Sequence, residues 1–497
     1  MKWFLVGAAM ASIFAIAPVS AQEPVDSPVS EAELRADIAY LASDALEGRA
    51  PGSPGETQAV HYIATQLAQA GFVGAADASG GWYQPVPLVE LYPQQASMTL
   101  ARTDGQIAPG VGAYRLRAPS GSASLSDVPL IFVGNGVDDE GRVTADVRGK
   151  VALLFIADRA GENALALRQR RDAMIAAGAV ATLLVPAPQQ SFAALDRRFS
   201  GGTPQLANWV SAGQVEGMLS PAFADTLLGT AGNSADLRRA ASDPSFPGTD
   251  LPLRATMTAQ TARRAYNSYN VVARRAGGRV GSGTVLMTGH WDHLGICGRA
   301  DAEDRICNGA VDNASGIAVL LAVARRLGSG APLDRDVLIV ATTAEESGLL
   351  GAYHLASAPP APLPTIAVTL NVDTVAIAPR GAPVATIGRG VAAIDAVVAD
   401  TARALGRRVD DDGEADAFVR RQDGWALQKS GVPAIMAGGS FSDMALLQQF
   451  LTGHYHGPDD ELHDDTPLGG AADDADLHVA LARRFGNIAT FPVMREQ

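Results

Sequence analysis

The stretch VLMTGHWD, residues 285–292, indicates the fold class. Residues 285–288 form a short apolar run, which is typical of a strand buried on both faces of a sheet. His290 and Asp292 follow where this strand should end. Ligands of open α/β sheets bind at the carboxyl ends of the strands, so the stretch predicts a functional residue at a sheet edge.

Two further apolar runs lead into carboxylates in the same way. Residues 337–342 precede Glu345, and residues 366–372 precede Asp373. Between the first two runs, residues 314–327 carry the Ala/Leu/Val-rich pattern of a buried helix. Strands that alternate with helices predict an α/β fold with a parallel or mixed sheet covered by helices on both faces.

The second half of the chain holds the donor set of a two-metal hydrolase. The segments are, in order, His290-Trp291-Asp292, Asp312-Asn313, Glu345-Glu346, Asp373 and Tyr455-His456. Zinc binds His nitrogen and Asp/Glu oxygen, and two metals can hold both the attacking and the attacked oxygen. We therefore expect these segments to meet at one edge of the sheet.

Each segment also has a simpler interpretation. Asp312 precedes the predicted helix and could be its N-cap, although Asn313 could do that instead. Glu345 and Glu346 could be surface charges, but two carboxylates at the end of an apolar strand are costly without cations. If that segment is extended, the two side chains point in opposite directions, so that one can bind metal while the other stays free. Asp292 is placed to accept the second ring N–H of His290.

The segments resemble the M28 family of zinc exopeptidases, specifically its bacterial leucyl aminopeptidase-like members. The resemblance lies in His290-x-Asp292, Asp312-Asn313-x-Ser315-Gly316, Glu345-Glu346-x-Gly348-x-x-Gly351, Asn371-x-Asp373, Tyr455-His456-x-Pro458-x-Asp460 and Gly48-Arg49-x-x-Gly52. It implies a mixed, mostly parallel sheet sandwiched by helices, as in zinc exopeptidases.

The resemblance also implies roles for single residues. His290 and Asp373 would bind one Zn²⁺, Glu346 and His456 a second, and Asp312 would bridge the two. Glu345 would be the general base. Asp292 would orient His290, and Tyr455 would donate a hydrogen bond to the tetrahedral oxyanion. The implied activity is removal of N-terminal residues from peptide substrates.

The family resemblance covers residues 30–95 and 250–497, which we predict to form one discontinuous peptidase domain. Residues 96–249 hold none of the expected ligands and have several short apolar runs. They resemble a protease-associated (PA) domain, notably at residues 147–151 and 176–179, and so predict an inserted β-rich module.

The N-terminus has the pattern of an export signal. Lys2 supplies the positive start, residues 3–17 are apolar and uncharged, and residues 19–21 are small enough for cleavage. The apolar run is shorter than the ~20 residues that a membrane-spanning helix needs. We therefore predict a signal peptide over residues 1–21, a periplasmic or secreted protein, and no stable membrane anchor.

The two cysteines, Cys297 and Cys307, are the only ones in the chain. In an oxidising compartment a disulfide is the first interpretation of such a pair. They lie between His290 and Asp312, in a stretch longer than the M28 resemblance leads us to expect. The bridged loop is thus predicted either to shape the rim of the site or only to stabilise an exported loop.

Charge and alternatives narrow the function further. The formal charge of −14, from 39 basic and 53 acidic residues, does not suit nucleic-acid binding. The alternatives left open are a carboxypeptidase or dipeptidase on the same scaffold, a single-zinc glutaminyl cyclase, and a non-catalytic binding module. His293, His354, His454, His463 and His478 lack partner motifs and are interpreted as surface or structural residues, with His454 as an alternative ligand to His456.

Overall fold

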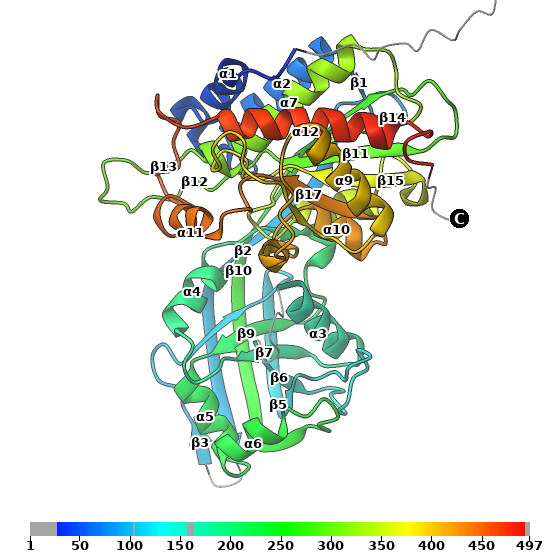
Figure 1. Ribbon diagram of the computed structural model, residues 1–497. Helices are drawn as coiled ribbons and strands as arrows, with labels where there is room; N and C mark the ends of the chain where they lie inside the picture. The colour runs from blue at the N-terminus through cyan, green and yellow to red at the C-terminus, as the bar shows by residue number, and fades with distance from the viewer. Residues whose placement is uncertain (1–26, 103–104, 157–163, 493–497) are drawn as a thin grey trace, which may run out of the picture.

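The computed structural model describes residues 27–102, 105–156 and 164–492 (Figure 1). The predicted signal peptide lies outside these residues. A 15-stranded sheet runs through both the upper and the lower part of the molecule in Figure 1. Its main path has the order β16-β17-β15-β11-β14-β10-β5-β6-β7-β9-β4.

The upper part has a mostly parallel sheet at its centre. Strands β11 (Thr284–His290), β14 (Asp336–Thr342), β15 (Ile366–Asn371) and β17 (Ala434–Gly438) run parallel to their neighbours in this group. The flanking strands β16 (Ala385–Ile387) and β10 (Thr249–Arg275) are antiparallel. The predicted α/β class with a mixed, mostly parallel sheet is confirmed.

Helices cover both faces of this sheet because the side chains of each strand alternate between two cores. Val285 and Met287 of β11 pack in one core, whereas Leu286 between them packs in the other. The first core is covered by α1 (Glu31–Leu41), α2 (Pro54–Gln69), α7 (Ser315–Ser329), α9 (Ala392–Ala404) and α12 (Gly469–Gly486). The second core is covered by α8 (Leu350–Ser357) and α10 (Gly424–Lys429).

The helices of the first core begin at residues suited to that place. Ser30 caps α1 by accepting from the N–H of Glu33, and Ser53 caps α2 by accepting from that of Glu56. Pro54 occupies the first turn of α2, where its missing N–H has no helical partner to lose. The short helix η1 (Asp44–Arg49) lies in the Gly/Pro-rich connection between α1 and α2.

Two long strands join the upper part to the lower one. Strand β2 (Tyr83–Arg102) pairs antiparallel with β10 along almost its whole length, and Figure 1 shows both running downward into the lower part. The limits 95 and 250 expected from sequence therefore fall within continuous strands.

The lower part has a core of its own, formed by the other strands and helices between β2 and β10. Its parallel strands are β5 (Ser122–Gly134), β6 (Val151–Phe155), β7 (Ala181–Val185) and β9 (Val215–Leu219). The remaining strands are β3 (Gly105–Ile107), β4 (Tyr114–Arg117) and β8 (Gln205–Leu206). The helices are α3 (Ala164–Ala176), α4 (Phe192–Ser200), η2 (Ala207–Trp209), α5 (Pro221–Gly229) and α6 (Ser234–Ala240).

The remaining elements of the upper part are short and lie mostly around its strand ends. They are β1 (Val73–Gly74), β12 (Gly295–Ile296), β13 (Ile306–Cys307), η3 (Ala310–Ala314), η4 (Leu363–Thr365), η5 (Glu414–Phe418) and α11 (Met444–Gly453). Within the described ranges, none of the helices combines the length and the apolar character that a membrane span requires.

Candidate metal centre and active site

The five predicted metal ligands come from five separate segments and lie together beyond the strand ends. His290 is the last residue of β11, and Asp312 lies in η3 just before α7. Glu346 is in the turn after β14, Asp373 follows β15, and His456 follows α11. All except His456 are largely buried.

Asp312 lies between the two imidazoles. Its Oδ1 is 3.2 Å from His290 Nε2, and its Oδ2 is 3.4 Å from His456 Nε2. Asp373 Oδ1 lies 3.6 Å from His290 Nε2, and Glu346 Oε2 lies 2.8 Å from His456 Nε2. The five donors thus divide into two groups that share Asp312, which we call the His290 half and the His456 half.

The local backbone accounts for the place of Asp312. The carboxylate of Asp460 accepts hydrogen bonds from the N–H groups of Val311 (2.8 Å) and Asp312 (3.0 Å). Asn313 Oδ1 accepts from the N–H of Gly316 (3.0 Å) in the first turn of α7. Asn313 therefore caps the helix, which leaves the Asp312 carboxylate free for the site; the peptide between them is cis.

Arg49 supports the same region from below. Its buried guanidinium donates to the carbonyl oxygens of Leu41 (2.6 Å), Trp291 (2.8 Å), Asn308 (2.5 Å) and Gly309 (3.1 Å). Burial lowers the pKa of Arg49 to about 10, so the group stays charged at neutral pH. One cation thereby fixes the loop after β11 and the loop before η3.

Asp292 acts on its neighbours differently from the sequence prediction. His290 Nδ1 lies 3.1 Å from the backbone carbonyl oxygen of Asp292, whereas the nearest carboxylate oxygen is 3.9 Å away. The expected bond from the ring to the carboxylate is therefore wrong, because the chain turns after β11 and brings the carbonyl to the ring. An Nδ1–H donated to this carbonyl still leaves Nε2 as the free acceptor.

The carboxylate of Asp292 instead holds the segment after β14. Its Oδ1 accepts from the backbone N–H of Glu345 (3.1 Å). Glu345 and Glu346 do not lie on an extended segment as expected: Gly348 and Leu349 both donate to the carbonyl of Glu345 in a tight turn. The turn still separates the side chains, since Glu345 lines the cleft while Glu346 faces His456.

His293 is a residue that sequence reasoning underestimated. It is buried, and its Nδ1 lies 2.6 Å from Glu346 Oε1, on the other oxygen from the one facing His456. The interpretation as a surface residue is therefore wrong. The ring of His454 is exposed and its Nδ1 lies 3.1 Å from the carbonyl of Asp459, so the alternative ligand points away from the site.

The charges of the site are strongly coupled. Burial opposes a charge on His290, but the carboxylates of Glu345 and Asp373 outweigh it and raise the pKa of His290 well above its usual value. Burial likewise opposes a charge on His456, whose contacts with Asp312 and Glu346 raise its pKa to about 9. Burial raises the pKa of Glu345 well above its usual range.

This donor set fits metal cations. His290, Asp312 and Glu346 each offer one ligand atom within 4.8 Å of the others. The carboxylates of Asp312, Glu345, Glu346 and Asp373 meet in a largely buried place, where uncompensated negative charge is costly. Imidazole and carboxylate ligands are what zinc prefers, so the residues suit it.

An adjoining cleft of about 450 Å³ gives access to the site. It is lined by His290, Asp312, Glu345, Asp373, Thr374, Phe418, Arg421, Gln422, Met436, Phe441, Leu447, Leu451 and Tyr455. The Tyr455 ring stacks on that of His456, with centroids 3.7 Å apart, and Arg421 Nη2 donates to its hydroxyl (3.4 Å). The cleft therefore joins an apolar wall to the polar donor set.

A buried imidazole and carboxylate cluster at the carboxyl edge of a mostly parallel sheet is the arrangement of a metal-dependent hydrolase. Residues 270–476 match the family model described as Peptidase family M28, so this part of the chain is an M28 peptidase domain. The resemblance found in the sequence is thereby confirmed. No curated protein matches the sequence.

Solved structures share the fold. An aminopeptidase from Aneurinibacillus sp. strain AM-1 has 17% identity and a TM-score of 0.54, over 93% of this chain and 95% of that one. BSAP, a zinc aminopeptidase from Bacillus subtilis, has 17% identity and a TM-score of 0.45, over 95% and 98%. A peptidase M28 precursor from Shewanella amazonensis SB2B has 18% identity and a TM-score of 0.42, over 94% and 99%.

Proposed function

We propose that the chain is an exported aminopeptidase that binds two Zn²⁺ ions and removes N-terminal residues from peptides. The observation that carries the proposal is the place of Asp312, which directs one carboxylate oxygen to His290 and the other to His456. His290 and Asp373 would hold one ion, Glu346 and His456 the other, and Asp312 both. When bound, zinc lowers the pKa of water and polarises a carbonyl group.

Glu345 is the proposed general base. Its carboxylate lines the cleft together with His290, Asp312 and Asp373, and Asp292 holds its backbone N–H. It would accept a proton from the attacking water as the new C–O bond forms. It would then pass that proton to the nitrogen of the leaving amine as the C–N bond breaks.

Tyr455 is proposed to stabilise the oxyanion. Burial raises the pKa of Tyr455, and the nearby carboxylates of Asp312 and Glu346 raise it further. The phenol therefore keeps its proton at neutral pH and can donate it in a hydrogen bond. Stacking on His456 fixes the direction of the ring.

Export and the aminopeptidase direction have separate support. The N-terminal pattern and the Cys297–Cys307 disulfide both suit an oxidising compartment outside the cytoplasm. The direction rests on the resemblance of the motifs to leucyl aminopeptidase-like enzymes and on the fold shared with the Aneurinibacillus aminopeptidase. The PA-like module is proposed to lie within residues 96–249.

The proposal is tested first by substitution of the base. Glu345→Gln should bind two zinc ions per chain and lose almost all turnover, because an amide takes up no proton. Glu303→Gln, at an exposed position, is the matched control and should behave as wild type. Wild-type turnover by Glu345→Gln would remove Glu345 from the mechanism.

Metal content and substrate choice test the rest. Two zinc ions per chain are expected; one would favour the glutaminyl cyclase and none a binding module. Aminoacyl-anilides should be hydrolysed, and N-blocked peptides should not. Hydrolysis of N-blocked peptides at an equal rate would favour a carboxypeptidase or another peptidase over the aminopeptidase, and activity that survives a chelator would exclude the metal mechanism.

A further inference from the structure

A disulfide-closed hairpin lies between the two predicted ligands His290 and Asp312. Strands β12 and β13 pair Gly295 with Cys307 in antiparallel register, and Gly298 donates to the carbonyl of Arg305 (3.1 Å). The Cys297–Cys307 bridge is present as predicted, with the two Cα atoms 5.8 Å apart. The hairpin is therefore fixed at its open end by a covalent bond.

The inner side of the hairpin rests on η1. A Cβ atom added at Gly48 would lie 2.4 Å from the carbonyl oxygen of Cys307 and 2.7 Å from that of Gly295. Gly48 also has a φ of +67°, which favours glycine. Backbone thus packs directly on backbone here, and the hairpin cannot move inward.

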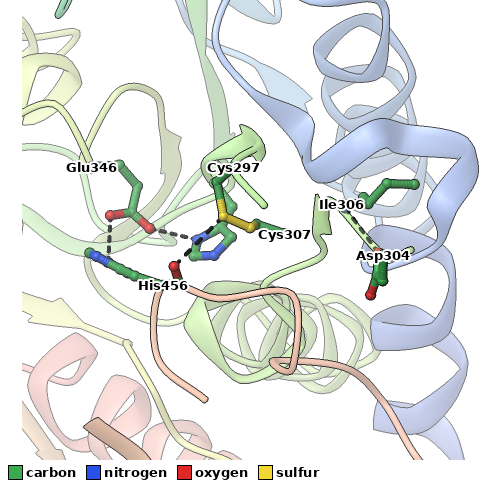
Figure 2. The surroundings of a disulfide bond; sticks show 7 residues. Cys297, Asp304, Ile306, Cys307, Glu346 and His456 are labelled. Atoms are coloured by element: carbon green, nitrogen blue, oxygen red, sulfur yellow. Dashed lines mark hydrogen bonds and ion pairs between the residues drawn. A yellow bond between two sulfur atoms is a disulfide. The ribbon is translucent and has the colours of Figure 1, made fainter. Parts of the chain in front are cut away.

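The outer side of the hairpin touches the His456 segment. The sulfur of Cys297 lies 3.7 Å from the carbonyl oxygen of His456, and Figure 2 shows the bridge beside His456 and Glu346. His456 has a φ of +60°, which residues other than glycine rarely adopt. Its backbone therefore depends on its neighbours to stay in this conformation, and the disulfide is one of them.

The stem of the hairpin makes a second contact with the same half of the site. His293, two residues before Gly295, lies 2.6 Å from Glu346 Oε1, and its ring meets that of His456 edge-on at 5.8 Å. Glu346 uses its other oxygen toward His456. The hairpin therefore supports both proposed ligands that belong only to the His456 half.

The two halves differ in how else they are held. The side chains of His290 and Asp373 are 2% and 11% exposed and stand at the ends of central strands. The side chain of His456 is 36% exposed and follows a surface helix. Only the His456 half relies on the hairpin.

We propose that the Cys297–Cys307 disulfide is a positioning element that fixes the Glu346–His456 half of the metal centre. The inference rests on the proposed two-zinc function. Loss of the bridge frees the hairpin from the His456 carbonyl and loosens the contact of His293. The zinc ion held by Glu346 and His456 is weakened, while the one held by His290 and Asp373 is retained.

The test compares zinc affinities of wild type and the double variant Cys297→Ser/Cys307→Ser. Serines also prevent free thiols from binding zinc. Competition with a chromophoric chelator measures the two stepwise dissociation constants without reference to activity. The weaker-bound zinc should lose at least tenfold in affinity and the tighter-bound one less than threefold.

A control in the same loop is Arg299→Ala, whose side chain is 83% exposed and pairs with Asp301. It should leave both affinities unchanged. If the double variant does not fold, wild type reduced with a phosphine replaces it: water gives its oxygen to the phosphine, and the S–S bond becomes two thiols. The phosphine is removed before the titration, and circular dichroism confirms the fold.

The outcomes separate the inference from the proposed function. Equal affinities with and without the bridge overturn the inference alone, as does an equal loss at both sites, which would indicate general loosening. A folded wild type that binds fewer than two zinc ions overturns the proposed function, and the inference with it.

Discussion

The backbone N–H of Asp312 donates a hydrogen bond of 3.0 Å to the carboxylate of Asp460. Asp460 lies four residues after His456, so this bond ties the segment of one proposed ligand to the backbone of the bridging one. The other Asp460 oxygen accepts from the N–H of Val311 (2.8 Å). One carboxylate therefore sets the distance between the two segments.

Asp460→Asn should weaken the metal centre without unfolding the protein. The amide has one oxygen, so one of the two N–H groups loses its acceptor and Asp312 gains freedom. Changes around metal ligands cost roughly 10–100-fold in metal affinity or activity, and we expect a loss in that range. Zinc titration and kcat/KM measure it. Asp459→Asn, at the exposed neighbouring position, should retain wild-type values, and equal losses in both variants would contradict the role of Asp460.

Arg49→Lys should lower stability although the charge is kept. Lysine has three N–H donors for the four carbonyl groups that Arg49 reaches, so at least one buried oxygen loses its partner. A buried polar group without a partner costs about 1–3 kcal/mol, and we expect a loss of that size in the free energy of unfolding. Urea unfolding measures it. The exposed change Arg299→Lys should cost nothing measurable, and an unchanged midpoint for Arg49→Lys would refute the prediction.

Removal of the metal should lower the melting temperature. The buried carboxylates then face one another without cations, and the stabilisation by binding is lost. A ligand at a free concentration of 100 times its Kd stabilises the folded state by about 2.7 kcal/mol per site. Thermal unfolding after dialysis against a chelator, and again after zinc is restored, should show a reversible shift. A melting temperature independent of zinc would argue against a metal centre.

The central strands were predictable because burial on both faces leaves continuous apolar runs. The run over residues 285–288 became β11, and the run over residues 337–342 became β14 with only its first residue added. The capping role of Asn313 was also predictable as an alternative, since its amide suits the start of α7. Patterns that depend on local sequence were thus read correctly.

Contacts set by turns were not predictable. The chain bends after His290, so the Asp292 carbonyl replaces its carboxylate at the ring, and no local pattern specifies that bend. His293 was underestimated because its partner Glu346 lies 53 positions away in the chain. The limits of the lower part are hidden for a related reason: β2 and β10 continue through them without a break.

His478 should make stability fall as the pH falls below 6.5. Burial lowers its pKa from 6.5 to about 4, and Nδ1 faces the carbonyl of Asp474 (2.7 Å). Between these values the unfolded chain takes up a proton that the folded chain refuses, so stability present above pH 6.5 is lost toward pH 4. From pH 7 to 5, wild type should lose about 2 kcal/mol more than His478→Asn, which cannot titrate. Urea unfolding at both values measures the difference, in which other titrating groups cancel. His61→Asn, exposed, should follow wild type; equal pH dependence in His478→Asn and wild type would show that His478 is not held neutral.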